Sequence, residues 1–123
     1  MFQRGEIVLG PFPAAEGNCN IGTHHLVVLD SDSDGTLVMF TTSLKEATGG
    51  SFEFTAQERL QANWAKPCRF DPSRIALFRN ADLHRLQPTG GRLGRKTIEK
   101  LILAGTRAKA TYAVFRAELR LAA

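Results

Sequence analysis

The stretch that decides the fold runs from residue 25 to residue 42, and its sequence is HLVVLDSDSDGTLVMFTT. Its first part, His25–Leu29, is a short apolar run, which is typical of a strand buried on both faces. Its last part, Thr36–Thr42, is also apolar and β-branched. The acidic segment Asp30–Gly35 between them has the composition of a turn. The stretch therefore predicts an antiparallel hairpin.

The aspartates of that turn match the start of a calcium-binding loop only in part. Asp30, Asp32 and Asp34 are followed by Gly35, but the twelfth position is Thr41, where such a loop has glutamate. The flanking segments are predicted strands, whereas a calcium-binding loop of this type joins two helices. We therefore interpret the segment as a polar hairpin turn.

Short strands and turns continue on both sides of the hairpin. Upstream, Glu6–Leu9 is a predicted strand that ends at Gly10–Pro13, and residues 14–23, rich in Gly and Asn, are a predicted long loop. Downstream, the pattern predicts a loop at 45–51, strands at 51–54, 68–70, 75–78 and 83–86, a break at Asp71-Pro72 and a turn at 88–91.

Capping and periodicity predict two helices. Thr55 and Glu58 have capping-box spacing, which predicts helical turns over 56–63, with Trp64 anchoring them to the core. Arg95–Ala104 carries apolar residues on one side, with Gly105 as its C-cap. The tail beyond it fits a helix or a strand, and we favour a helix.

These elements predict a mainly β fold class, a small β-barrel with appended helices. The length of 123 residues suggests one domain, here assigned to residues 1–105, followed by an appendage at 106–123. Hydrophobic residues make up 43% and charged residues 23%, which excludes disordered and fibrous classes. Neither a membrane-spanning stretch nor an export signal is evident, so we expect a cytoplasmic protein. Cys19 and Cys68 are expected to remain reduced thiols.

Charge is distributed unevenly along the chain. Residues 1–65 carry three Lys or Arg against eight Asp or Glu, a balance of −5. Residues 66–123 carry thirteen against four, a balance of +9. This asymmetry is consistent with a surface that attracts an anion such as nucleic acid, and equally with a solvated basic helix.

Several short segments follow one another along the chain in an order that can be compared with known families. They are Arg4–Leu9 with Pro11–Pro13 behind it, the apolar run Leu26–Leu29, the strand end Thr41–Ser43, Lys66-Pro67 before a predicted strand, and Gly91–Leu93 before the helix at 95–104. In this order they resemble the MazF/PemK family of ribonuclease toxins, over about residues 4–104.

The resemblance implies a fold, an activity and partners. The fold would be the SH3-like barrel of MazF, PemK and CcdB, in a homodimer. The activity would be metal-independent, cofactor-free cleavage of single-stranded RNA by the toxin of a type II toxin–antitoxin system. An antitoxin protein would inhibit it by laying its tail across the RNA groove.

The resemblance also implies site residues. In that family an arginine, commonly followed by proline, opens the second strand, and a threonine, often followed by serine, ends the third. Thr42 and Ser43 match the second of these positions, and His24-His25 stand where Arg-Pro is usual. His24 and Thr42 are therefore the expected catalytic residues, with His25 and Ser43 as lesser candidates.

Histidine suits the chemistry of RNA cleavage. The 2′-OH attacks its own phosphate, so the site must accept a proton, donate one to the leaving 5′-oxygen and hold a charged phosphorane. Histidine, with a pKa of ~6.5, can do each of these in one of its protonation states, and the hydroxyl of Thr42 with nearby backbone N–H groups would stabilise the phosphorane. Neighbouring strand residues point to opposite faces, so only one of His24 and His25 can face the groove unless the strand begins at residue 25 or later.

Polar and basic residues supply candidates for RNA binding. Asn18, Asn20 and Thr23 lie in the predicted loop, and Lys45 and Arg69 are the basic candidates. Only basic residues that line the concave side near Thr42 could bind phosphate, and the sequence does not show which do. Three further basic residues gather before the last helix: Arg92, Arg95 and Lys96. Phe12 and Phe40 are possible platforms for bases, although Phe in a barrel is usually part of the core.

Other interpretations stay open. A histidine pair at a strand edge can simply satisfy hydrogen bonds, and the barrel would then be a catalytically degenerate module that binds RNA or a peptide. A structural barrel without a groove is a third interpretation. Metal binding by His24, His25 and His84 is weaker, because adjacent histidines chelate poorly from a strand and no carboxylate has suitable spacing. We expect no metal and no membrane partner.

Overall fold

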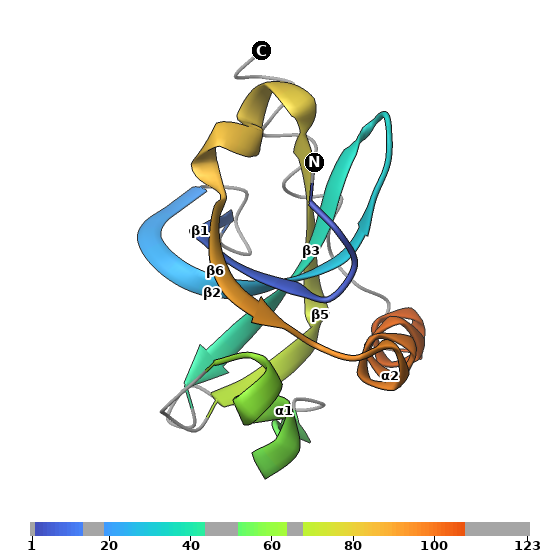
Figure 1. Ribbon diagram of the computed structural model, residues 1–123. Coiled ribbons are helices and arrows are strands. Elements are labelled where there is room, and N and C mark those ends of the chain that lie inside the picture. Colours follow the sequence, from blue (N-terminus) through green and yellow to red (C-terminus); the bar gives the residue numbers. More distant parts are fainter. Residues whose placement is uncertain (1, 14–18, 44–51, 64–67, 108–123) are drawn as a thin grey trace.

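In the computed structural model, the described residues are 2–13, 19–43, 52–63 and 68–107. They form a mainly β fold in which one antiparallel sheet has the strand order β4-β5-β3-β2-β1-β6 (Figure 1). The elements are β1 (Glu6–Pro13), β2 (Cys19–Ser31), β3 (Gly35–Ser43), β4 (Phe52–Glu53), α1 (Ala56–Gln61), β5 (Cys68–Arg79), the 3₁₀ helix η2 (Asn80–Arg85), β6 (Gln87–Arg92) and α2 (Arg95–Arg107). No helix among these residues is long and apolar enough to cross a membrane.

The predicted hairpin is confirmed as β2 and β3. Their register pairs Leu26 with Phe40 and Val28 with Val38. At the turn, the Asp32 carboxylate accepts hydrogen bonds from the backbone N–H groups of Asp34 and Gly35, at 2.7 and 3.3 Å. Asp32 therefore stabilises the reversal of the chain.

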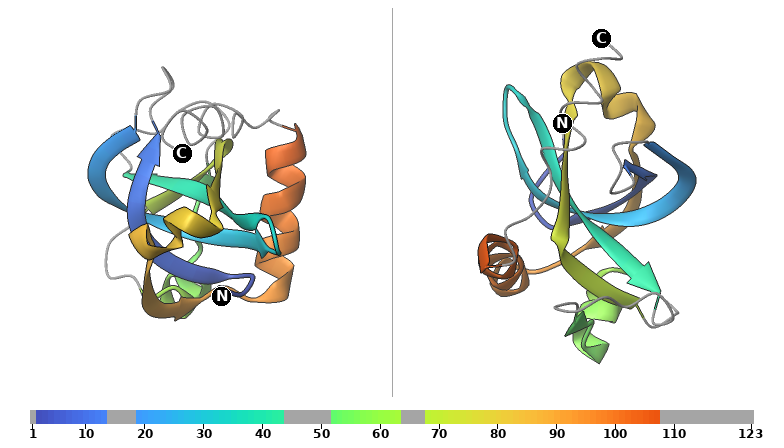
Figure 2. Two further views of the ribbon diagram at one scale, coloured as in Figure 1. Left: turned by 90° about the horizontal axis from the view of Figure 1, so that it is seen from above. Right: turned by 180° about the vertical axis from the view of Figure 1, so that it is seen from behind.

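Both faces of the central strands are buried, as the run of apolar residues predicts. Val27 and Leu29 belong to one core cluster, which also includes Ile98 and Leu101 of α2. Their strand neighbours Leu26 and Val28 belong to a second cluster, as expected when alternate residues face opposite sides. Figure 2 shows the sheet curling strongly, with α2 packed along one side of it. A run without polar alternation is the pattern that such a strand requires.

Two expected loop segments are strands instead. The predicted loop at 14–23 was wrong for residues 19–23, which extend β2 and pair with the end of β1, as in Phe12–Asn20. The predicted turn at 88–91 was wrong, since this segment pairs with β1 as strand β6. In both segments the backbone hydrogen bonds of a neighbouring strand outweigh the low strand propensity of Gly, Asn and Pro. Residues 14–18 and the expected loop at 45–51 lie outside the described residues.

The predictions of separate strands at 68–70 and 75–78 were also wrong. β5 is continuous from Cys68 to Arg79, and the expected break is a bulge within it. Phe40 pairs with Asp71, but the next residue of β3, Met39, pairs with Ile75. Residues 72–74 therefore have no partner on β3, and Pro72 sits in this bulge, where no ladder N–H is needed.

Of the other short elements, one prediction was wrong and two were confirmed. Residues 83–86 are not a strand, because 80–85 form η2 and Leu86 caps it through a hydrogen bond from its N–H to the Leu83 carbonyl at 3.0 Å. The short strand near 51–54 is confirmed as β4. Helix α1 is confirmed too, and it ends at Gln61. Trp64 lies outside the described residues.

Helix α2 is confirmed but is longer than predicted. Gly105 lies inside it instead of capping it, because the helix continues to Arg107. A methyl group at Gly105 would lie 2.8 Å from Cδ1 of Ile75. The glycine thus permits the close approach of α2 to β5, which explains its place inside a helix. Of the expected appendage, residues 106 and 107 belong to α2 and residues 108–123 lie outside the described part.

Glu58 joins the two helices through a buried carboxylate. The capping box is complete: Thr55 N–H donates to Glu58 Oε1 at 2.9 Å, and Glu58 N–H donates to the Thr55 hydroxyl at 3.1 Å. Two groups of α2, the Thr97 hydroxyl and the Lys100 ammonium, donate to Oε2 at 3.0 and 2.9 Å. Burial raises the pKa of Glu58, but these hydrogen bonds and the charge of Lys100 lower it by more, so the pKa lies below 4.5.

We predict that Glu58→Ala lowers the free energy of unfolding by about 2 kcal/mol, because it removes the cap and leaves Lys100 without its buried partner. The control Glu99→Ala removes an exposed pair with Arg95 and should cost less than about 0.5 kcal/mol. Since the folded-state pKa is lowered, this contribution is present above pH 4.5 and is lost as the pH falls through the folded-state value. Urea denaturation at two pH values measures both effects, and equal stabilities of the two variants would contradict the assignment.

Candidate functional site around His24 and Arg74

The two expected histidines lie within β2 and face opposite sides of the sheet. Because the strand begins at Cys19, well before them, the alternation of side chains applies to both. The His24 ring lies on the side of the second core cluster, 5.0 Å from the ring centroid of Phe40 at an angle of 58°. The His25 backbone carbonyl accepts a hydrogen bond from the Thr41 hydroxyl at 2.7 Å. Because the strand begins before both histidines, the expectation that only one of them faces a given site applies to this fold.

Arg74 brings a guanidinium to the same ring. Its Cζ lies 4.2 Å from the centroid of Phe40 and 5.4 Å from that of Phe12, within the range of a cation–π contact. Arg74 is the last residue of the β5 bulge, which releases it from the regular ladder with β3. His24 and Arg74 therefore both contact Phe40, although they come from different strands.

The aromatic rings of this cluster are part of the core. Phe12 is 3% exposed and Phe40 is 4% exposed, and their centroids lie 4.9 Å apart. A base could not stack on either ring without displacing its neighbours. The expectation that these phenylalanines belong to the core is thus confirmed, and the alternative that they are base platforms is not supported. They contact His24 and Arg74, which are both partly exposed.

The other expected catalytic positions lie on β3. Thr42 pairs with Arg69 of β5, and Ser43 pairs with Cys68. β3 is hydrogen-bonded to β2, so Thr42 and His24 belong to neighbouring strands. The structure describes the backbone of Thr42 and Ser43 but not their side chains, so nothing is said of a contact between His24 and Thr42.

The expected RNA-binding residues are dispersed. Thr23 is exposed, directly before His24. Arg69 is opposite Thr42 and forms an ion pair with Glu53 of β4, with 3.3 Å between Nη1 and Oε1. Asn20 lies in β2, but nothing of its side chain is described, and the same holds for Cys19 and Cys68 in their strands. Asn18 and Lys45 fall outside the described residues.

Sequence reasoning missed Arg74. It lies in a segment taken as the gap between two strands, and no spacing along the chain relates it to residue 24. The available signal was Asp71-Pro72 inside an otherwise strand-like run, which favours a bulge as well as a break.

A titratable imidazole and a permanent cation are both present at this site, since His24 and Arg74 each contact Phe40. A neutral imidazole can accept a proton near pH 7, and a guanidinium can hold a phosphate oxygen through charge-assisted hydrogen bonds. His84 lies elsewhere, on η2, with Nδ1 3.1 Å from the Ala81 carbonyl. Among the described residues, no three His, Cys, Asp or Glu side chains are grouped so that they could hold a metal ion. The arrangement can therefore bind an anion and move one proton.

The sequence was compared with known protein families and with curated proteins. A scan against protein-family models and a search of curated proteins find no match for this sequence. The likeness to the MazF/PemK family described above remains a prediction.

His25 should make stability depend on pH. Burial lowers the pKa of His25 below 6.5, so protonation favours the unfolded chain, and stability is lost as the pH falls from 6.5 through the folded-state pKa. We predict that His25→Gln flattens this part of the stability curve in thermal denaturation between pH 7.5 and 5. His84→Gln, at an exposed position on η2, serves as the matched substitution for comparison. An unaltered slope in His25→Gln would contradict the prediction.

Proposed function

We propose that this chain is an endoribonuclease of the MazF/PemK type that binds single-stranded RNA across the surface around His24. In this proposal the curled sheet closes as an SH3-like barrel, and the protein acts as the toxin of a type II toxin–antitoxin pair. A homodimer and an inhibitory antitoxin protein are part of the same proposal.

The observation that carries the proposal is the approach of His24 and Arg74 to one ring. His24 contacts Phe40 at 5.0 Å and Arg74 contacts it at 4.2 Å. The sequence resemblance leaves the position of the family's arginine occupied by a histidine. A guanidinium from β5 that contacts the same phenylalanine ring would provide the lacking permanent charge. Proton transfer and charge stabilisation, which RNA cleavage needs together, thus have a candidate residue each.

The chemistry follows from these two groups. Neutral His24 accepts the proton of the ribose 2′-OH, and the 2′-oxygen forms a bond to the adjacent phosphorus. Arg74 holds the charged phosphorane, with the Thr42 hydroxyl as a second donor. The bond from phosphorus to the 5′-oxygen then breaks, and that oxygen takes a proton from solvent. The products are a 2′,3′-cyclic phosphate and a free 5′-OH.

The buried phenylalanines support this assignment physically. A cation and an imidazole held against a rigid apolar wall lose little side-chain freedom when a phosphate arrives, and preorganisation of this kind strengthens electrostatic stabilisation. Phe40 is also in the ladder between β2 and β5, where it pairs with Leu26 and with Asp71. Phe40 therefore pairs with both of the strands that carry the proposed functional residues, β2 and β5.

We predict that His24→Ala and Arg74→Ala each lower the rate of cleavage of a long single-stranded RNA by about 100-fold. The matched controls are His84→Gln and Arg79→Ala, which change exposed residues of η2 and of the far end of β5. Gel analysis of end-labelled RNA gives the rates, and mass spectrometry identifies the terminal 2′,3′-cyclic phosphate.

Three results would contradict this proposal. One is intact RNA across pH 5–9, with and without metal ions. Another is full activity in His24→Ala. The third is cleavage by His24→Arg alone, which would mean a toxin scaffold whose native histidine has disarmed it. RNA binding without cleavage by the native protein would favour the binding module instead.

A further inference from the structure

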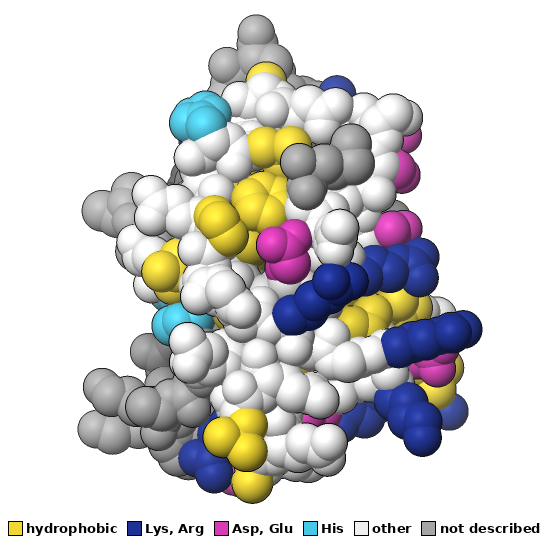
Figure 3. Space-filling view, in the orientation of Figure 1, with side chains coloured by type: hydrophobic (Ala, Val, Ile, Leu, Met, Phe, Trp, Pro, Cys, Tyr) yellow, Lys and Arg dark blue, Asp and Glu magenta, His cyan; other side chains and the backbone are white. Residues whose placement is uncertain are grey.

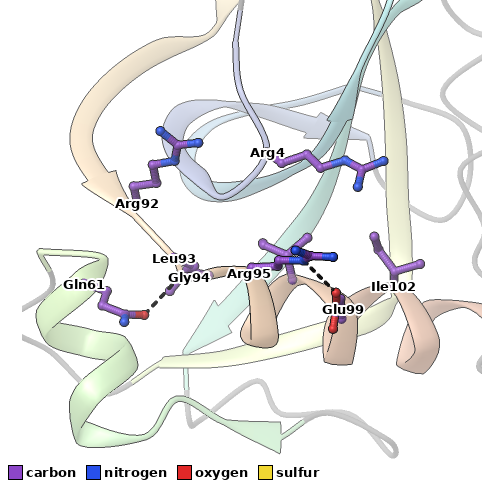
Figure 4. A pocket seen from close by; sticks show the side chains of 9 residues that line it. Arg4, Gln61, Arg92, Leu93, Gly94, Arg95, Glu99 and Ile102 are labelled. Atoms are coloured by element: carbon purple, nitrogen blue, oxygen red, sulfur yellow. Dashed lines mark hydrogen bonds and ion pairs between the residues drawn. The ribbon is translucent and has the colours of Figure 1, made fainter.

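A cavity lies away from His24, where β6 leads into α2. Its volume is about 540 Å³, which lies within the range of sites that bind small ligands. Arg4 approaches it from the segment before β1, Arg92 from the end of β6, and Arg95 from the first turn of α2 (Figure 4). Arg4 contacts Asp30, which lies six residues along β2 from His24, or about 20 Å of strand length at ~3.3 Å per residue, and His24 is not among the residues that line the cavity.

Positive charge dominates the rim of this cavity. Three arginines and one carboxylate, that of Glu99, line it. Arg95 Nε lies 3.1 Å from Glu99, and Arg4 Nε lies 3.2 Å from Asp30, both in exposed pairs that contribute little and exchange readily. Arg92 makes no ion pair with any described residue. The first turn of α2 has no acidic side chain, so the helix dipole adds to the positive potential.

The floor of the cavity is aliphatic. Leu93 is 3% exposed and Ile98 is 4% exposed, whereas Ile102 is 39% exposed. Figure 3 shows basic side chains on both sides of an apolar patch on this face. Among the lining residues none is aromatic. A ligand that covers Ile102 and meets the arginines therefore combines an apolar group with negative charge.

We propose that this cavity binds a short segment of a partner protein in which carboxylates flank an aliphatic side chain. The aliphatic residue covers Ile102, and the carboxylates pair with Arg92 and with Arg4 or Arg95. A peptide fits better than single-stranded RNA, because single-stranded bases stack mainly on aromatic side chains, none of which lines this cavity, whereas its branched aliphatic floor suits an aliphatic side chain. Arginine forks match carboxylates in bidentate geometry. The proposal is independent of the nuclease function.

The test uses a displayed library of random twelve-residue peptides, selected on the full-length protein. We expect enrichment of sequences that hold two or more acidic residues next to Leu, Ile, Val or Met. Fluorescence anisotropy with the enriched peptides, synthesised with a dye, then gives affinities. Arg92→Glu and Ile102→Asp should each weaken binding about tenfold or more. Replacing the acidic residues of the peptide by their amides should have a similar effect.

Matched controls distinguish binding at this cavity from binding that depends only on the overall charge or surface hydrophobicity of the protein. Arg79→Glu reverses an exposed charge outside the cavity, and Leu103→Asp changes the exposed neighbour of Ile102. Both should bind the peptides as the native protein does, and circular dichroism confirms that every variant is folded.

Three outcomes would overturn the proposal. The first is a selection without acidic and aliphatic enrichment. The second is equal weakening by Arg92→Glu and Arg79→Glu. The third is a loss of single-stranded RNA binding in Arg92→Glu that matches the loss of peptide binding, since the cavity would then belong to an RNA path. Failure of RNA cleavage alone leaves the peptide result intact, so the two proposals are tested separately.

Discussion

The register shift between β3 and β5 is the constraint on which the site depends. Phe40 pairs with Asp71 and Met39 pairs with Ile75, so residues 72–74 stand out of the ladder. A bulge increases local twist and redirects a side chain, and here it leaves Arg74 over the ring of Phe40. On the other side, Phe40 pairs with Leu26, two residues from His24. One buried phenylalanine thus fixes the relative positions of an imidazole and a guanidinium that are fifty residues apart.

Patterns local to the chain were enough to predict the hairpin and both helices. The apolar run at 25–29 has no polar alternation because both of its faces are buried, and Thr55 with Glu58 forms the expected capping box. Elements that depend on a distant partner were not predictable in this way. Residues 88–91 are a strand because β1 offers them hydrogen bonds, and Gly105 lies inside α2 because Ile75 approaches there. Tertiary context overrides propensity in both.

The candidate site likewise contains features that local sequence could predict and features that depend on distant strand pairing. Alternation along a strand predicted that His24 and His25 face opposite sides, and the fold agrees. Arg74 was out of reach, because its place depends on a bulge that forms only when β5 pairs with β3. Of the three arginines at the α2 cavity, Arg92 and Arg95 lie three residues apart and form a basic group already evident in the sequence, whereas Arg4 joins them from a distant segment. Two regions of β2 therefore have different proposed roles: RNA chemistry near His24, in the middle of the strand, and partner recognition near Asp30, at its end.

The most direct measurement is an imidazole and guanidinium NMR titration with a 2′-O-methyl single-stranded RNA, which binds without being cleaved. Spectra of ¹⁵N-labelled protein, assigned with His24→Gln, His25→Gln and Arg74→Lys, follow the ring nitrogens and Nε through the titration. The account predicts that the side-chain ¹⁵N signals of His24 and Arg74 shift together and follow one binding curve, while the ring signals of His25, on the other face of the sheet, do not shift. A shift of His25 without His24, or no shift of Arg74 at saturating RNA, would contradict it.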